Sequence, residues 1–112
     1  MPYDEELADR VRALLASEEA IDERRMMGGL VFLRHGNMLG GVRRDGLMVR
    51  VGPEGYAEAV QEPHVGPMAI GNRSPKGFVV VATEAVATEP ELRRWLARGL
   101  ALASALPPKP AR

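Results

Sequence analysis

The first predicted helix follows Asp4, a residue type that caps helix N-termini. The next apolar residues recur at the three- and four-residue spacing of one helix face: Leu7, Val11, Leu14 and Leu15. Glu5 and Glu6 suit the positive end of a helix dipole. We therefore predict an amphipathic helix here, followed by a polar turn over residues 17–23.

Short apolar runs in the next third of the chain predict strands. Three runs separated by turn sequences predict an antiparallel meander, at residues 30–33, 38–43 and 47–51, with residues 24–27 leading into it. The turns at residues 35–37 (HGN) and 44–46 (RDG) hold residue types that tolerate the positive φ of tight hairpins. Gly40 and Gly41, inside the second run, indicate a bulge or the close approach of another backbone.

The region after the meander mixes breakers with one strongly apolar run. Pro53 suits the first turn of a short helix. Its inward residues are expected to be Tyr56, Ala59 and Val60. Residues 62–76 hold three prolines and two glycines and are predicted to be mostly loop, with a brief strand at residues 68–70. Residues 78–82 (FVVVA) are β-branched and uncharged, which predicts a buried strand.

The last helix has the clearest start. Thr88 and Glu91 have the spacing of a capping box, in which each side chain binds the other's backbone amide. The apolar stripe that follows consists of Leu92, Trp95, Leu96, Leu100, Ala103 and Leu106. Prolines end the helix, and residues 107–112 are predicted to be a frayed tail. The order α-βββ-α-ββ-α over residues 1–112 predicts one α+β domain, a two-layer sandwich with helices on one face of an antiparallel sheet.

Composition narrows the classes of function. The 112 residues suffice for one domain, and the absence of cysteine excludes disulfides, thiolate nucleophiles and Cys-ligated zinc. The 15 basic residues balance 15 acidic ones, whereas direct nucleic-acid binding usually requires a basic excess. The acidic start lacks the pattern of a secretion signal, and no run approaches the roughly 18 apolar residues of a membrane span. We expect a cytoplasmic protein without a nucleic-acid or membrane partner.

The residue types that carry chemistry do not fall into a recognised pattern. His35 and His64 are the two histidines, and they lack the spacing of a metal-binding motif. The glycines of the meander lie between predicted strands, whereas a phosphate-binding loop leads into a helix N-terminus. No serine lies in a nucleophile elbow, although residues distant in sequence can still meet in a fold. We expect no catalytic residue, no cofactor and no metal, and therefore a protein that is not an enzyme.

Arginines and methionines are the candidates for binding a partner. Arginine pairs at residues 24–25 and 43–44, with Arg50, either form an oxyanion-binding cluster or pair with nearby acidic residues as a solvated face. Five methionines lie on or near the predicted sheet, where they serve recognition or fill a core poor in aromatic residues. The residues predicted to bind a partner, in one sheet neighbourhood, are Arg25, Met26, Met48 and Arg50.

Several segments occur in a recognisable order: residues 25–29 (RMMGG), Phe32, residues 36–38 (GNM), residues 46–51 (GLMVRV), Trp95 and Gly99. They resemble the N-terminal domain of the TfoX/Sxy competence-regulator family, over residues 3–106. Met27 departs from the family, which more often has an aromatic residue there. The resemblance implies the fold of that domain and a link to expression of DNA-uptake genes, alongside a cyclic-AMP-responsive activator. The best-known members continue into a helical C-terminal domain, so this chain resembles a stand-alone copy of the first domain.

Two hypotheses of function follow. The first is a non-enzymatic regulatory or adaptor module that binds another protein, linked through the resemblance to transcriptional or competence regulation. Its binding surface is expected to be the sheet face without helices, which also suits a homodimer. The alternative is a small-ligand-binding protein or minor enzyme with a pocket under the loop of residues 62–76.

Overall fold

The structure is a computed structural model that describes residues 3–26, 28–69 and 71–109. Within these ranges the helices are α1 (Glu5–Leu15), α2 (Gly52–Ala59) and α3 (Glu89–Ser104), with a 3₁₀ helix η1 (Thr83–Val86). The strands are β1 (Ile21–Met26), β2 (Gly29–Arg34), β3 (Asn37–Arg43), β4 (Gly46–Arg50), β5 (Val65–Pro67) and β6 (Phe78–Val81). They form one antiparallel sheet in the order β1-β2-β3-β4-β6-β5.

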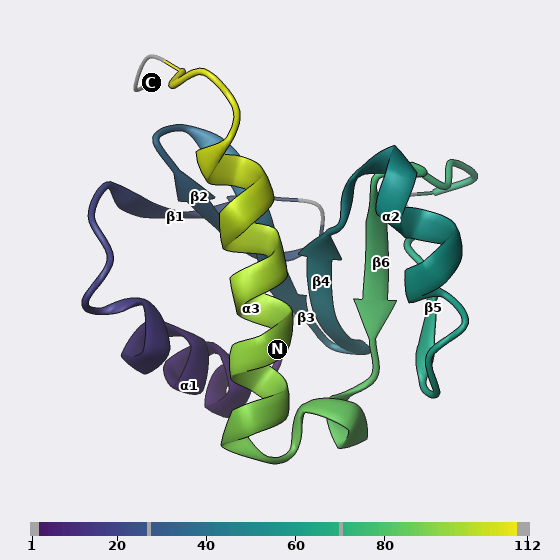
Figure 1. The fold of residues 1–112 in the computed structure, drawn as a ribbon. Helices are drawn as coiled ribbons and strands as arrows, with labels where there is room; N and C mark the ends of the chain where they lie inside the picture. The colour runs from purple at the N-terminus through teal and green to yellow at the C-terminus, as the bar shows by residue number, and fades with distance from the viewer. Residues whose placement is uncertain (1–2, 27, 70, 110–112) are drawn as a thin grey trace.

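The helices form the second layer of a sandwich. α1 and α3 lie in front of the sheet in Figure 1, and α2 lies on the same side, next to β6 and β5. The predicted α+β class, with helices on one face of an antiparallel sheet, is confirmed. α1 begins as predicted, because Asp4 Oδ1 accepts a hydrogen bond from the Leu7 amide at 3.1 Å.

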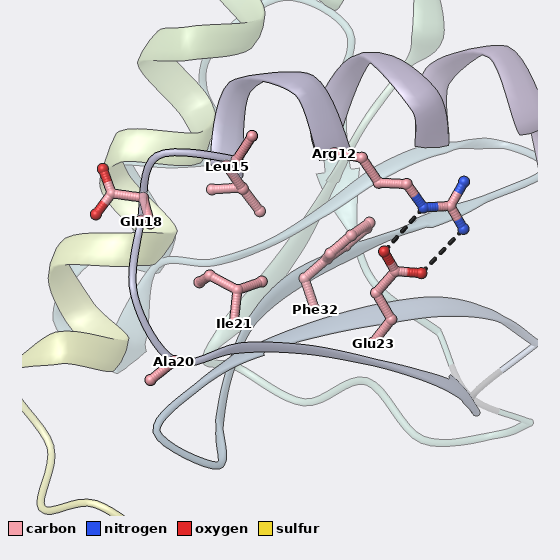
Figure 2. Close-up of a pocket in the computed structure, with 8 residues that line it drawn as sticks. Arg12, Leu15, Glu18, Ala20, Ile21, Glu23 and Phe32 are labelled. Carbon is pink, nitrogen blue, oxygen red and sulfur yellow. Dashed lines mark hydrogen bonds and ion pairs between the residues drawn. The ribbon is translucent and has the colours of Figure 1, made fainter.

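Strand β1 precedes the predicted meander and makes it four-stranded. All six of its residues pair with β2, from Ile21 opposite Arg34 to Met26 opposite Gly29. The sequence (IDERRM) shows no apolar alternation because an edge strand leaves much of its surface in water. Glu23 rises from β1 to Arg12 of α1 and accepts two hydrogen bonds from it, at 2.8 and 2.9 Å (Figure 2).

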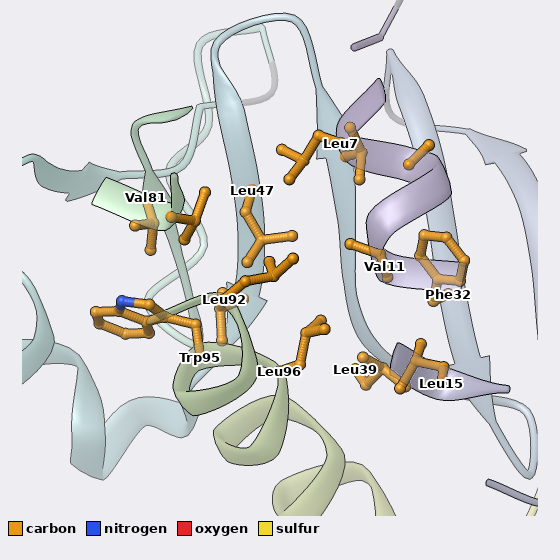
Figure 3. Packing of buried hydrophobic residues seen from close by; sticks show 14 of the residues in the cluster. Leu7, Val11, Leu15, Phe32, Leu39, Leu47, Val81, Leu92, Trp95 and Leu96 are labelled. Atoms are coloured by element: carbon orange, nitrogen blue, oxygen red, sulfur yellow. The ribbon is translucent and has the colours of Figure 1, made fainter. Parts of the chain in front are cut away.

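The main core lies between the sheet and the helices. Side chains from α1, α3 and the strands converge there, including Val11, Phe32 and the fully buried Trp95 (Figure 3). α3 can approach β3 closely because its Gly99 has no side chain. A Cβ atom at that position would collide with the carbonyl oxygen of Leu39. Leu39 is the extra residue of a bulge between β2 and β3, as the neighbouring glycines predicted.

A second, smaller core lies on the opposite face of the sheet. Its buried members are Val31, Leu33, Met48 and Met68. Met68 comes from the loop between β5 and β6 and is 0% exposed. The strand predicted at residues 68–70 is wrong in position: the paired segment is β5, three residues earlier. Met68 instead turns its side chain into the sheet, and Ile70 lies outside the described residues.

The capping box predicted for α3 does not form. Thr88 is the N-cap residue, but its side chain makes no capping hydrogen bond. Glu91 instead accepts a hydrogen bond from Arg94 at 2.8 Å, because a charged donor binds a carboxylate more strongly than a backbone amide.

The predicted frayed tail is wrong for residues 107–109. Asn37 Nδ2 donates to the Pro107 carbonyl at 2.9 Å, and the Lys109 amide donates to the His35 carbonyl at 2.8 Å. These two bonds hold the segment against the β2–β3 turn. Residues 110–112 lie outside the described part of the chain.

Candidate protein-binding surface

Strand pairing decides which side chains share a face, because directly paired residues of antiparallel strands project to the same side. We call the side away from α1 and α3 the open face. The strand residues that project to it are Asp22, Arg24, Met26, Val31, Leu33, Met38, Arg43, Met48, Arg50, Phe78 and Val80. The remaining strand side chains project into the main core or its rim.

The four residues predicted to bind a partner do not come together. Arg25 lies on the helix side, where its guanidinium carbon is 6.0 Å from the centroid of the Tyr3 ring. Met26 of β1 and Arg50 of β4 both project to the open face. Met26 is 40% exposed, and Met48 is 0% exposed. Met48 is therefore inaccessible to a partner. Met26 and Arg50 share the open face but lie on β1 and β4, three strands apart, so the predicted neighbourhood does not form.

Met48 is buried because its neighbour on β3 has no side chain. A Cβ atom on Gly41 would lie 2.7 Å from Met48 Cε, so the methionine covers the space that the glycine leaves. Met68 then packs against the same cluster. Met48 is thus a core filler, one of the two roles that the sequence left open. The pairing of Gly41 with Met48 was the signal, and it requires the strand register.

Arginines lie at the edge of the accessible part of the open face. Arg50 Nη1 donates to the Met38 carbonyl at 3.2 Å, and its guanidinium stacks on Phe78 with 5.6 Å between the guanidinium carbon and the ring centroid. Arg43 Nη1 donates to the Ala69 carbonyl at 3.0 Å. These contacts leave donor groups of both guanidiniums for a further partner. The sequence named Arg43 in a possible arginine cluster but not among the four residues predicted to bind a partner, because its face depends on the register.

The charges of the molecule are divided between its two sides. Ion pairs on the helix side include Arg12–Glu23, Arg34–Glu18, Arg93–Glu89, Arg94–Glu62 and Arg98–Glu62. The described strand residues on the open face include three arginines and a single carboxylate, Asp22. Arg24 forms no ion pair with any described residue, and Arg43 is 3.7 Å from Asp45. A chain without net charge therefore presents a basic face.

The ion pairs on the helix side connect elements. Arg94 donates to Glu62 at 2.8 Å, and this hydrogen bond lowers the pKa of Glu62 below its ordinary value. The Arg94 and Arg98 guanidiniums also lie 4.8 and 4.9 Å from the Trp95 ring centroid. These contacts join α3 to the segment after α2, so these charges have a structural role.

A hollow of about 350 Å³ lies between α1 and β1 (Figure 2). Leu15, Ile21 and Phe32 line it together with charged residues at its rim. The rim carboxylates, Glu18 and Glu23, are already paired with arginines. A ligand entering this hollow would have to compete with those ion pairs.

The described residues include no group of three His, Asp or Glu side chains placed to hold a metal ion. His64 Nδ1 lies 3.7 Å from Glu84, on the exposed surface. Met68 occupies space beneath the loop of residues 62–76, where a ligand pocket was predicted, and that pocket stays a prediction. No helix in the described ranges is both long and apolar enough to cross a membrane.

The fold and this surface define a small α+β sandwich domain with one helical side and one basic sheet face. The chain belongs to the TfoX N-terminal domain family, whose model matches residues 13–103. No match was found among the curated proteins or among the solved structures. The resemblance seen in the sequence is confirmed, although Met27, where the chain departs from the family, lies outside the described residues. Family membership suggests a regulatory or competence-related role.

Proposed function

We propose that this chain is a non-enzymatic regulatory adaptor whose open face binds an acidic segment of a partner protein. The observation that carries the proposal is the set of arginines beside apolar side chains on that face. Arg24, Arg43 and Arg50 project there, together with a single strand carboxylate, Asp22. Membership of the TfoX N-terminal domain family supports a regulatory role, linked to transcription or competence.

The chemistry of the open face favours a peptide over a simple anion. Guanidinium groups bind carboxylates through two parallel hydrogen bonds. Next to them, Met26 is exposed, while Met38 and Phe78 are half-buried. An acidic segment with interspersed apolar residues would satisfy both features, because methionine adapts its shape to varied partners.

Site-directed photo-crosslinking tests the surface directly. Phe78 is replaced by p-benzoylphenylalanine, which keeps an aromatic ring on the open face, and the protein is irradiated in its native cells. Tyr56 of α2, a half-buried aromatic residue on the helix side, receives the same replacement as a matched control. We expect a discrete adduct from position 78 and a much weaker one from position 56.

Charge variants decide whether the adduct reports the proposed contact. The R43Q/R50Q double variant removes two open-face arginines, and R93Q removes an arginine from the helix side. We expect R43Q/R50Q to lose the adduct by about tenfold and R93Q to retain it, with circular dichroism confirming that each variant folds. An adduct that survives R43Q/R50Q, or equal adducts from positions 56 and 78, contradicts the proposal.

A further inference from the structure

Strand β1 leaves one edge of the sheet unpaired. It is the first strand in the sheet order, with β2 as its neighbour on one side. The His35 amide donates to the Ala20 carbonyl at 3.0 Å, so even-numbered residues of this strand turn their polar backbone groups toward β2. The backbone groups of Ile21, Glu23 and Arg25 therefore point outward, where a further strand can bind them.

We propose that two copies of this chain dimerise by pairing their β1 edges antiparallel, about a two-fold axis at Glu23. The axis is perpendicular to the sheet, so the two sheets become continuous and both helical layers lie on one side. In this register Ile21 lies opposite the partner's Arg25, and Glu23 lies opposite the partner's Glu23. The outward backbone groups of all three residues then meet one another, which satisfies both edges.

The charges of β1 select this register. Asp22 lies opposite the partner's Arg24 on the open face, and the symmetry repeats the pair. Opposite charges directly across two strands stabilise pairing, whereas like charges oppose it. The one like-charged pair is formed by the two copies of Glu23, and each of these is already neutralised by the two hydrogen bonds from its own Arg12.

Neighbouring registers lack this complementarity. Residues that pair across the two strands must project to the same face, so odd-numbered residues can pair only with odd-numbered residues and even-numbered with even-numbered. An axis at Asp22 brings two unpaired carboxylates together, and an axis at Arg24 brings two unpaired guanidiniums together. Charges on an edge strand usually discourage association. In β1, however, the order of the charged residues favours association in one register.

The dimer also completes the hollow between α1 and β1. The partner's Arg25 projects to the helix side opposite Ile21, which lines this hollow. The second copy thereby contributes a residue to the edge of each of the two hollows. This inference concerns the β1 edge. It engages Arg24 with the partner's Asp22 and leaves Arg43 and Arg50 to the proposed binding of an acidic segment.

A charge-swap series tests the register by sedimentation equilibrium, which measures the dimer dissociation constant. The wild type is expected to approach twice its monomer mass of 12.2 kDa with increasing concentration. D22R and R24D each place like charges across the axis and should weaken the dimer about tenfold or more, since two cross-strand pairs are reversed. The D22R/R24D double variant exchanges the charges and should restore the wild-type constant. R44D, in the exposed β3–β4 turn, serves as the control and should leave it unchanged.

A disulfide crosslink tests the same dimer even where the charge variants fold poorly. The chain has no cysteine, so E23C introduces a single thiol at the two-fold axis. Directly paired residues are about 5.5 Å apart between Cα atoms, within disulfide range. We expect mild oxidation to yield a disulfide-linked dimer from E23C and far less from D45C in the β3–β4 turn. A monomer at all concentrations, a dimer insensitive to the swaps, or equal trapping of E23C and D45C overturns the proposal.

Discussion

At the scale of single residues, the pairing of Gly41 with Met48 organises the second core. The glycine leaves a space on the open face, and the methionine side chain fills it completely. Close-packed interiors respond to added volume as well as to lost volume, because surrounding atoms cannot all move aside. The identity of one small residue thus determines where a large neighbour lies.

G41A is expected to destabilise the protein. The added Cβ would lie 2.6 Å from the Leu30 carbonyl oxygen, a backbone atom that cannot swing away, and 2.7 Å from Met48 Cε. Overpacking of this kind costs about 1–3 kcal/mol in the free energy of unfolding, which urea denaturation measures. G66A is the matched control, since a Cβ there has no atom within 4 Å. Equal stability of G41A and the wild type would contradict the packing described.

At the scale of elements, the loop between β5 and β6 holds the open face together. It brings Met68 over Val31 and Leu33 of β2 and over Met48 of β4. The loop is therefore part of the core of the sheet's second side. Its contribution is apolar burial, which scales with the surface removed from water.

M68A and M26A make the same chemical change in opposite environments. Met68 is 0% exposed and Met26 is 40% exposed, although both belong to the open side of the sheet. We expect M68A to lower the free energy of unfolding by about 2–4 kcal/mol, because it removes buried atoms and leaves a cavity. M26A should change it by less than about 1 kcal/mol. Chemical denaturation of both variants checks this, and similar losses for the two would refute the assigned burial.

At the scale of the whole molecule, charge is distributed by side. Carboxylates and arginines on the helical side neutralise one another, and several of these pairs connect separate elements. The open face keeps arginines whose strand neighbours include only Asp22 as a carboxylate. A net charge of zero therefore conceals an asymmetry, and under the proposed function this asymmetry directs the acidic partner to the open face.

The Glu62–Arg94 pair should make stability depend on pH. The hydrogen bond from Arg94 lowers the pKa of Glu62 in the folded state, so folding favours the ionised form. Its contribution is present above the unfolded pKa of about 4.3 and is lost as pH falls through the lower folded pKa. Urea unfolding between pH 7 and pH 3 should show E62Q less stable than the wild type at pH 7, with the difference shrinking on acidification. E58Q alters an exposed carboxylate that pairs with no described residue, and it should show no such trend; a constant difference for E62Q would rule out the linkage.

Local sequence patterns predicted most of the elements. The helical spacing of Leu7 and Val11, with the Asp4 cap, correctly identified α1 because both signals act within one or two helix turns. β1 was not recognised as a strand, because an edge strand needs no apolar alternation. The capping box at Thr88 failed because Arg94 binds Glu91, a competition that local spacing does not reveal.

The candidate site was predictable in composition but not in geometry. Arginines and methionines were identified as the residue types of interest, and Met26 and Arg50 do share the open face. Arg25 lies on the helical side although Arg24, its neighbour in sequence, lies on the open face. Successive residues of a strand project to opposite faces, so a sequence pattern without register cannot separate the two.

The sequence by itself determined the class, the helices, the meander and the family of this protein, because apolar periodicity and turn residues act over short stretches of chain. Only the tertiary structure decided which side chains are available for binding. Met48 is buried because Gly41 and Met68 come from other segments of the chain. The basic face exists because strand register directs Arg24, Arg43 and Arg50 to the side without helices. Both outcomes depend on contacts between residues distant in sequence, and only strand pairing and packing establish such contacts.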